Sequence, residues 1–397
     1  MIKVILKKGR EDSILRFHPW VFSGAIAQIQ GEPEEGDIVA VHASDGTYLA
    51  SGHYQIGSIA VRILSFTEDP SSPDFYYSML SKARDLRLAE GLLSDKGDTD
   101  CFRLVHGEGD GLPGLIIDWY DGVCVLQAHS VGMFRAKLQI AEALKKLFGD
   151  SLKAVYDKSS GTAPFKAGLE LIDGYLYKKE GFTERELVVS ENGRKFIVNW
   201  EEGQKTGFFL DQRENRDLVG RYAKDRKVLN LFCYTGGFSI YALSAGALSV
   251  DSVDSSAKAM RLVDRNVALN GVADRHTSHC EDAIEFLGKC GEGKYDLIIV
   301  DPPAFAKHRG ALHNALRAYQ RLNAAAISKV APGGLVFTFS CSQVVDKISF
   351  ANTVFSAAAQ TGRSVRILGR LCQGPDHPVN IYHPEGEYLK GLLLYVE

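Results

Sequence analysis

The chain has 397 residues, of which 45% are hydrophobic and 24% are charged. This composition is typical of a globular protein with two or three separately cored domains. The net charge of −3 gives no overall electrostatic signature of nucleic-acid binding. No run of about 18 uncharged apolar residues is present, and the amino-terminal segment has no apolar signal-peptide core, so the sequence predicts a cytoplasmic protein without a membrane segment.

The seven cysteines are odd in number, widely scattered and without the CxxC pairs typical of zinc sites. They lie at positions 101, 124, 233, 280, 290, 341 and 372. We therefore expect reduced thiols and no metal site.

Residues 1–72 alternate short apolar runs with turn signals, including the hairpin cue Asp45-Gly46. A compact β module is expected, with its boundary in the Pro- and Ser-rich stretch around residue 72. Its first sixteen residues carry a basic strip, made of Lys3, Lys7, Lys8, Arg10 and Arg16. Because residues 1–72 hold six basic and nine acidic side chains in all, the strip fits either a local RNA contact or a solvated face.

Residues 73–187 mix helical and strand patterns. A helix is expected over 75–93 and another over 133–149, where apolar residues recur at roughly 3.6-residue spacing. Asp121-Gly122 indicates a β-hairpin, and short strand-like runs follow the second helix. The segment reads as a small α+β domain.

Residues 188–397 change to alternating strands and helices. Strand-like runs lie at 227–232, 248–254, 277–282, 295–301, 334–341, 364–370 and 389–397. This order predicts an α/β fold with a seven-stranded doubly wound parallel sheet, and the missing helix between the last two runs indicates a final antiparallel strand. Ligands of such sheets bind beyond the carboxyl ends of the strands.

A double glycine, Gly236 and Gly237, follows the first strand and permits a tight turn into a helix. Asp254 follows the second strand and lies 17 residues after Gly237, near the spacing at which an acidic residue meets ribose hydroxyls. Together they predict a nucleoside-containing ligand. Asp254 could instead cap the next helix, a role that Ser255 or Ser256 fills equally well.

Three further residues end strands of this sheet. Asp282 could bind an adenine amino group or cap a helix. Asp301 stands before Pro302 and Pro303, which stiffen the turn and leave carbonyls that can face a planar substrate. Cys341 is either a small buried side chain or, at the same sheet edge as Asp301, a nucleophile.

Six motifs occur together and in order: HPWVFSGAI, KTGFFLDQR, LNLFCYTGGF, VDPPAF, FSCS and DHPVNIYHPEGEYLKG. By these motifs the chain resembles, over essentially its whole length, the RlmI-type class I S-adenosylmethionine-dependent methyltransferases, which make 5-methylcytosine in bacterial 23S rRNA. The resemblance implies a PUA-like RNA-binding domain over 1–72, an EEHEE-type domain over 73–187 and a Rossmann-like methyltransferase domain over 188–397. It also implies S-adenosylmethionine as the cofactor and 23S rRNA as the partner. Related proteins include dimers, although no residue here requires one.

The resemblance also assigns roles to individual residues. Cofactor contacts are implied for Phe208, Asp211, Gln212, Arg213, Tyr234, Thr235, Gly236, Gly237, Asp254, Asp282 and Asp301. Asp301 and the turn Pro302, Pro303 and Phe305 would hold a flipped cytosine, and Cys341 would be the nucleophile. A thiolate is needed because cytosine C5 becomes nucleophilic only after addition at C6. No second cysteine follows Pro303, so product release would differ from that of enzymes that use one, and Phe305 could stack on the base.

Two other readings fit part of the sequence. Methylation of an exocyclic amine on guanine or adenine uses similar acid-Pro-Pro-aromatic turns without a thiol, which would leave Cys341 without a role. A non-catalytic RNA-binding assembly factor could retain the cofactor fold, although the acid, the thiol and the glycine turn argue against it. The residues do not identify the base that removes the C5 proton.

Overall fold

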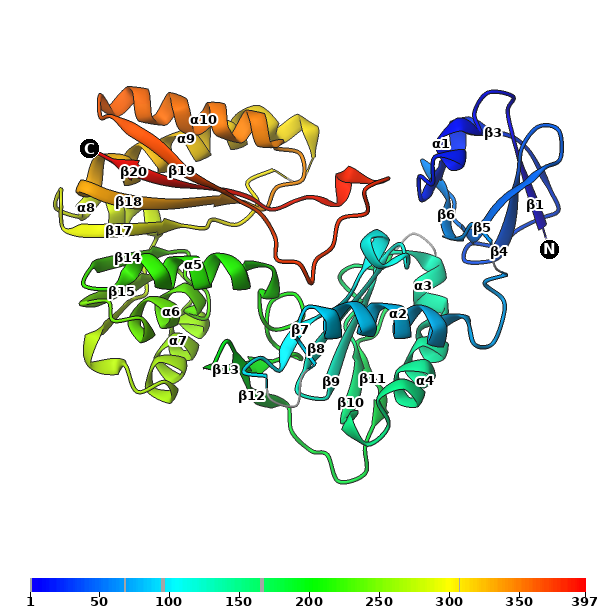
Figure 1. The fold of residues 1–397 in the computed structure, drawn as a ribbon, viewed down its shortest axis with the longest axis horizontal. Helices are drawn as coiled ribbons and strands as arrows, with labels where there is room; N and C mark the ends of the chain where they lie inside the picture. The colour runs from blue at the N-terminus through cyan, green and yellow to red at the C-terminus, as the bar shows by residue number, and fades with distance from the viewer. Residues whose placement is uncertain (1, 68, 94–96, 165–167, 307) are drawn as a thin grey trace. The chain divides into compact units, whose positions relative to one another are not determined.

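The computed structural model describes residues 2–67, 69–93, 97–164, 168–306 and 308–397 (Figure 1). The chain forms two compact units. The first unit contains Met1–Leu187, Val198–Phe208 and Pro375–Gly386, and the second contains Val188–Ile197, Phe209–Gly374 and Glu387–Glu397. Within the described ranges, no helix is both long and apolar enough to cross a membrane. All seven cysteines are free in the structure.

The amino-terminal part of the first unit is a six-stranded sheet in the order β2-β6-β5-β4-β1-β3. Its strands are β1 (Ile2–Leu6), β2 (Trp20–Phe22), β3 (Ile26–Gln30), β4 (Ile38–His42), β5 (Tyr48–Tyr54) and β6 (Ile59–Ser65), with α1 (Asp12–Leu15) after β1. Alternate residues such as Val4, Val39 and Val61 point into one apolar core. The expected β module is confirmed.

The rest of the first unit is built on a five-stranded sheet in the order β11-β10-β9-β8-β7. The strands are β7 (Cys101–His106), β8 (Leu115–Tyr120), β9 (Val123–Ala128), β10 (Ala154–Asp157) and β11 (Gly174–Lys178), and the helices are α2 (Phe75–Ala89), α3 (Val131–Arg135) and α4 (Lys137–Phe148). The predicted hairpin is the β8–β9 turn. The helix expected over 133–149 is wrong in one respect, because it divides at Ala136 into α3 and α4.

A two-stranded hairpin follows, made of β12 (Glu186–Glu191) and β13 (Arg194–Asn199). Two segments that sequence reasoning placed in the third domain, 198–208 and 375–386, fall in the first unit. The boundaries at 72 and 187 stay predictions.

The second unit contains the predicted seven-stranded sheet, in the order β16-β15-β14-β17-β18-β20-β19. The strands are β14 (Lys227–Leu231), β15 (Ser249–Val253), β16 (His276–His279), β17 (Tyr295–Val300), β18 (Val330–Ser340), β19 (Val365–Leu371) and β20 (Lys390–Val396). The helices are α5 (Arg213–Ala223), α6 (Gly237–Ser244), α7 (Ala257–Leu269), α8 (Ala283–Lys289), α9 (Leu312–Lys329) and α10 (Lys347–Thr361). The last strand, β20, runs antiparallel to both neighbours, as expected, and inserts between β18 and β19.

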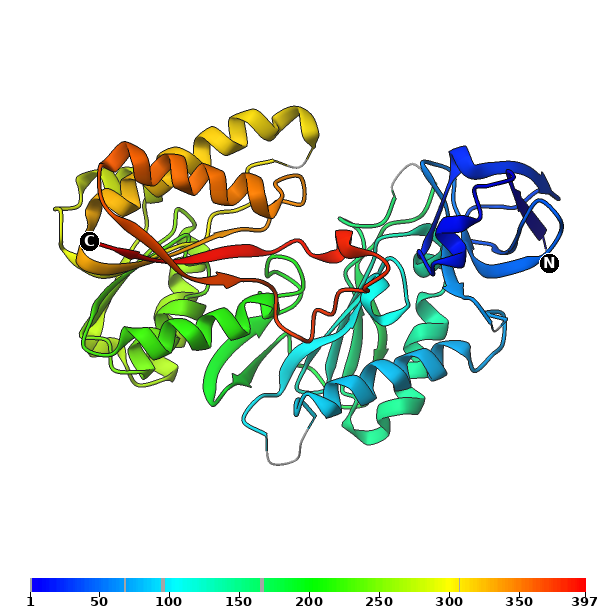
Figure 2. The ribbon, with the colours of Figure 1, turned by 45° about the horizontal axis from the view of Figure 1, so that its top comes forward.

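Helices cover both faces of this sheet, and β18 shows how. Val336 packs into the core cluster that includes α9 and α10, which lie side by side in Figures 1 and 2. The next residue, Phe337, meets Tyr222 of α5, and Phe339 meets Phe238 of α6. Because successive side chains of a strand point to opposite faces, this pattern requires a sheet buried on both sides. Such a sheet leaves its strand ends as the place where polar side chains can gather.

Candidate active site

The turn after β14 is a tight loop that admits little more than glycine at two positions. Gly236 has φ +80°, and a Cβ there would lie 3.1 Å from Val263. A Cβ on Gly237, the first residue of α6, would lie 2.9 Å from the Arg216 side chain. The Thr235 carbonyl accepts a hydrogen bond of 3.0 Å from Asn266. The loop is therefore held close to its surroundings by backbone contacts, as a cofactor-binding turn requires.

Asp254, at the end of β15, joins this turn to the next one. Its Oδ2 accepts the backbone N–H of Tyr234 at 3.0 Å, and its Oδ1 accepts that of Ser256 at 2.9 Å. The helix cap is Ser256, whose side chain accepts from Ala259 N–H. Asp254 is therefore not the cap of α7, and its ribose contact stays a prediction.

Asp282 is the cap of α8. Its Oδ1 accepts the backbone N–H groups of Ile284 at 2.8 Å and Glu285 at 3.0 Å. The capping alternative is thus the one that the structure shows. A contact of Asp282 with adenine would have to be made in addition to it.

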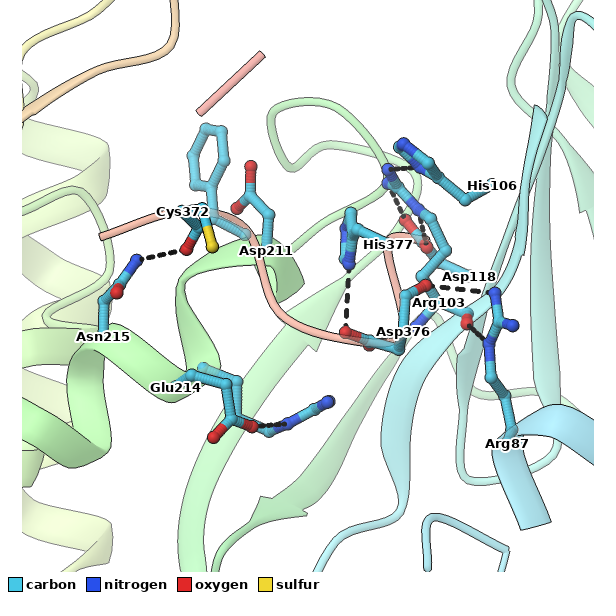
Figure 3. Close-up of polar contacts among 12 residues, drawn as sticks. Arg87, Arg103, His106, Asp118, Asp211, Glu214, Asn215, Cys372, Asp376 and His377 are labelled. Carbon is cyan, nitrogen blue, oxygen red and sulfur yellow. Dashed lines mark hydrogen bonds and ion pairs between the residues drawn. The ribbon is translucent and has the colours of Figure 1, made fainter. Parts of the chain in front are cut away.

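The residues of the FLDQR stretch divide between the two units. Phe208 is buried in the first unit, whereas the other three lie in the second, Asp211 and Gln212 in a 3-10 turn before α5 and Arg213 as the first residue of α5. Gln212 donates to Asp301 Oδ2 at 3.0 Å and accepts from Asn215 at 2.6 Å. Asn215 also donates to the Cys372 carbonyl at 3.0 Å (Figure 3).

Asp211 is held from the other side by Tyr388. The Tyr388 hydroxyl donates to Asp211 Oδ2 at 2.6 Å. Asp211 Oδ1 is buried and has no hydrogen-bond partner among the described residues. An acceptor left in this state is expected where a ligand supplies the donor.

Asp301 ends β17 with its side chain half-buried. Burial raises the pKa of this carboxyl from 3.8 to about 7, and the nearby Asp211 carboxylate adds to the rise, while the Gln212 hydrogen bond and Arg216 oppose it. At neutral pH the group is therefore shared between its acid and carboxylate forms. It can donate a hydrogen bond in one form and accept in the other.

Cys341 follows β18 with an intermediate exposure, so it is not fully buried. Its two serine neighbours make specific contacts. Ser340 donates to the Tyr319 hydroxyl at 3.0 Å. Ser342 donates to the Ala306 carbonyl at 2.6 Å. Ser342 thus connects the thiol segment to the turn that follows Asp301, and Ser340 connects it to α9.

That turn is ordered by packing. Pro302 is buried and Pro303 is exposed. The Phe305 ring lies 4.7 Å from the Tyr319 ring, centroid to centroid, at 51°. Part of the Phe305 surface is therefore occupied by Tyr319, and its predicted stacking on a base would use the rest.

Three residues of this constellation were missed from the sequence. Asn215 lies three residues after Gln212, the N-cap of α5, and this spacing predicts contact and could have revealed it. Tyr319 lies in the middle of α9, at a position without a sequence signal. Tyr388 lies in the loop before β20 and within the last quoted motif, which could have revealed it.

Comparison with known proteins agrees with this arrangement. Residues 4–66 match a PUA-like domain, and residues 102–394 match the S-adenosylmethionine-dependent methyltransferase family. Proteins named ribosomal RNA large subunit methyltransferase I are 40% identical in Shewanella amazonensis, covering 100% of this chain and 99% of the relative, and 42% identical in Pseudoalteromonas atlantica, covering 99% of each. The chain belongs to the ribosomal RNA large subunit methyltransferase I family.

Solved structures show the same fold at lower identity. A methyltransferase in complex with SAH has a TM-score of 0.84, and an S-adenosylmethionine-dependent methyltransferase from Streptococcus mutans has 0.83. Each is 20% identical and covers 100% of both chains. These two structures show that the chain shares their fold over its full length.

S-adenosylmethionine is the cofactor of this methyltransferase, and the second unit fits it. The close-approach turn at Gly236 and Gly237 suits a ligand seated against backbone. Asp211 Oδ1 offers a buried acceptor, and the raised pKa of Asp301 shows a place where a positive group would be favourable. These features match a cofactor that carries an ammonium and a sulfonium charge.

The DHPV part of the last motif has a structural role in the first unit of this methyltransferase (Figure 3). Arg87 pairs with Asp110 through two bonds of 2.9 and 2.7 Å and donates to the Asp376 carbonyl at 3.0 Å. The Asp376 carboxylate accepts the backbone N–H of Arg103 at 3.0 Å. His377 contacts the His106 ring. These buried contacts fix the segment 375–386 onto the β7 region.

Proposed function

We propose that this methyltransferase methylates C5 of a cytosine in 23S rRNA through a covalent adduct between Cys341 and C6. The observation that carries the proposal is that the loops after two neighbouring strands, β17 and β18, are hydrogen-bonded to each other. Asp301 follows β17 and Cys341 follows β18, which pair in parallel, and the Ser342 to Ala306 hydrogen bond of 2.6 Å ties the two loops together. The names of the relatives support large-subunit rRNA as the substrate.

The chemistry assigns one task to each group. The Cys341 thiolate adds to C6 of the cytosine, forming the S–C6 bond and pushing electron density toward C5 and N3. Asp301 in its acid form can donate a hydrogen bond to N3, which stabilises the charge that develops there. S-adenosylmethionine, when bound, supplies the electrophilic methyl group. Loss of the C5 proton to a base then lets the S–C6 bond break and releases the thiolate.

The substrate must also reach the site. A cytosine in a helical stack cannot present C6 to a thiolate at a sheet edge, so the target base must be unpaired or flipped out. The exposed Pro303 and the uncovered part of Phe305 are the surfaces of the turn that remain available to such a base. A homodimer stays a prediction.

The first test asks what is modified. Mass-spectrometric mapping of 23S rRNA from a strain that lacks the gene should show one unmethylated cytosine, and the purified enzyme should restore the methyl group. Unchanged cytosine methylation would refute the proposal, as would loss of a methylated guanine or adenine in its place.

The second test asks how. Cys341→Ser should lower the methylation rate by about 10³-fold or more, since the oxygen nucleophile is far weaker at neutral pH. Cys280→Ser, at an exposed cysteine of the same unit, is the control and should retain the parent rate. Methylation of an exocyclic amine predicts appreciable activity in Cys341→Ser. An RNA-binding factor without catalysis predicts no methylation by the parent protein.

A further inference from the structure

Lys390 is a buried lysine at the same sheet edge as Cys341. It is the first residue of β20 and lies opposite Ser340 of β18 in the antiparallel register. Only 6% of its surface is exposed. A lysine is almost never buried to this extent unless its charge is compensated.

The ammonium group holds the segment that follows the thiol. Its Nζ donates to the Ser342 carbonyl at 2.5 Å and to the Val345 carbonyl at 2.6 Å. Ser342 directly follows Cys341 and Val345 lies four residues after it, so Lys390 fixes the backbone that leaves the thiol. Both bonds use N–H groups of Lys390 as donors, and a pKa of about 8 leaves the amine largely protonated at neutral pH.

The charges around Lys390 single out Cys341. Burial lowers the pKa of Lys390 to about 8, and Cys341, Asp346 and Glu387 oppose this shift while Lys347 adds to it. Asp346 is already the cap of α10, where it accepts the Ser349 N–H, and Glu387 pairs with Lys347. Cys341 is thus the acidic group that most strongly opposes the lowering of the Lys390 pKa, and it directly precedes Ser342, whose carbonyl Lys390 holds. Tyr319 also interacts with Cys341, and it stays neutral because burial raises its pKa to about 12.

We propose that Lys390 is a positioning residue that orients the Cys341 segment through its two carbonyl contacts and favours the thiolate form of Cys341 by its charge. The role rests on the proposed function, in which this thiolate is the nucleophile. It requires no proton transfer, because the ammonium keeps its protons and the thiol proton passes to solvent before addition.

The test measures the thiol without RNA. The full-length protein is alkylated with iodoacetamide over a range of pH, and mass spectrometry follows the Cys341 peptide. Lys390→Met should raise the pH midpoint of Cys341 alkylation by about one unit, since an adjacent opposite charge favours an ionised group by about 1–3 units. At pH 7 the rate should fall about threefold, because about tenfold fewer thiolates are partly offset by their greater intrinsic reactivity.

Two further variants make the result specific. Lys347→Met removes a nearby positive charge that is 58% exposed, and it should leave the midpoint unchanged. Lys390→Arg keeps the positive charge, so its pH midpoint of Cys341 alkylation should lie close to that of the parent. An unchanged midpoint in folded Lys390→Met would overturn the proposal.

Failure to fold would not leave the proposal untested. The parent protein by itself should show a Cys341 midpoint below the value of about 8.5 for an ordinary thiol, and a midpoint at or above that value would overturn the electrostatic role. The alkylation assay and the methylation assay also fail separately. If Lys390→Met raises the midpoint while Cys341→Ser still methylates RNA, Lys390 has its effect on the thiol and the covalent mechanism is wrong.

Discussion

Asp301→Asn should make the folded protein more stable at alkaline pH while it damages the site. Burial and the Asp211 carboxylate disfavour the ionised form of Asp301 in the folded state. Asparagine has nearly the same shape and can still accept the hydrogen bond from Gln212, but it carries no charge. The substitution therefore removes an electrostatic penalty and leaves the packing in place.

The size and sign follow from the pKa. The folded state has a pKa of about 7 and the ordinary value is 3.8, so between these pH values the folded state binds more protons than the unfolded state. The contribution of Asp301 therefore lowers the free energy of unfolding of the parent as pH rises through this window, and it stays constant above about pH 7. Three units correspond to about 4 kcal/mol at about 1.4 kcal/mol per unit. Because Asp301 keeps part of its surface in water, we expect about 1–3 kcal/mol at pH 8.

The assay is urea unfolding followed by circular dichroism from pH 4 to 8.5, without cofactor. The free energy of unfolding of Asp301→Asn minus that of the parent should be near zero at pH 4, grow to pH 7 and then stay constant. Asp274→Asn is the control, because its carboxylate is 77% exposed in the same unit, and it should show no such growth. A difference that does not depend on pH, or a variant less stable than the parent at pH 8, would refute the reasoning.

Two predictions concern the loops of the site. Ser342→Ala should lower the free energy of unfolding by about 1–2 kcal/mol and the methylation rate by about tenfold, because the two loops lose the hydrogen bond that joins them. Ser356→Ala, which removes an exposed hydroxyl bonded to a carbonyl, is the control and should match the parent in a methyl-transfer assay. Phe305→Ala should weaken RNA binding by about 1–3 kcal/mol without changing the cofactor Kd, whereas Phe355→Ala, at a ring 72% exposed on α10, should change neither in titrations with each ligand. Equal losses in Ser342→Ala and its control, or a loss of cofactor affinity in Phe305→Ala, would contradict these assignments.

The sheet of the second unit was predictable because most of its inner strands are buried on both faces and read as short apolar runs bounded by turns. The edge strands β16 and β19 are more exposed, but they too overlap predicted runs. The insertion of β20 between β18 and β19 was not found, because strand order depends on which edges pair in three dimensions. The break of the predicted helix at Ala136 was also missed, since the apolar spacing continues across it.

The site was predictable where chemistry and strand ends coincide. Asp301 and Cys341 were selected because parallel strands bring their carboxyl ends to one edge. For Asp282 the sequence supported adenine binding and helix capping equally, and the structure shows that this residue caps α8. Tyr319 acts through a neighbour that is distant in sequence, so no local pattern could indicate it. Lys390 lies in the last quoted motif, but its burial and its contacts depend on the folded chain.

The two carboxyl groups of Asp211 and Asp301 make the unliganded second unit electrostatically unfavourable at this site. Asp211 and Asp301 are two carboxyl groups withdrawn from water near each other, and one of their oxygens, Asp211 Oδ1, has no hydrogen-bond donor in the described chain. This arrangement costs stability in the unliganded protein, and a cationic ligand would offset the cost on binding. A positively charged cofactor should therefore bind more tightly as pH rises toward 7, as Asp301 ionises, whereas its product, which has lost the sulfonium charge, should gain less. The penalty that the folded chain carries at Asp301 is thus the same free energy that would favour the charged cofactor over its neutral-sulfur product.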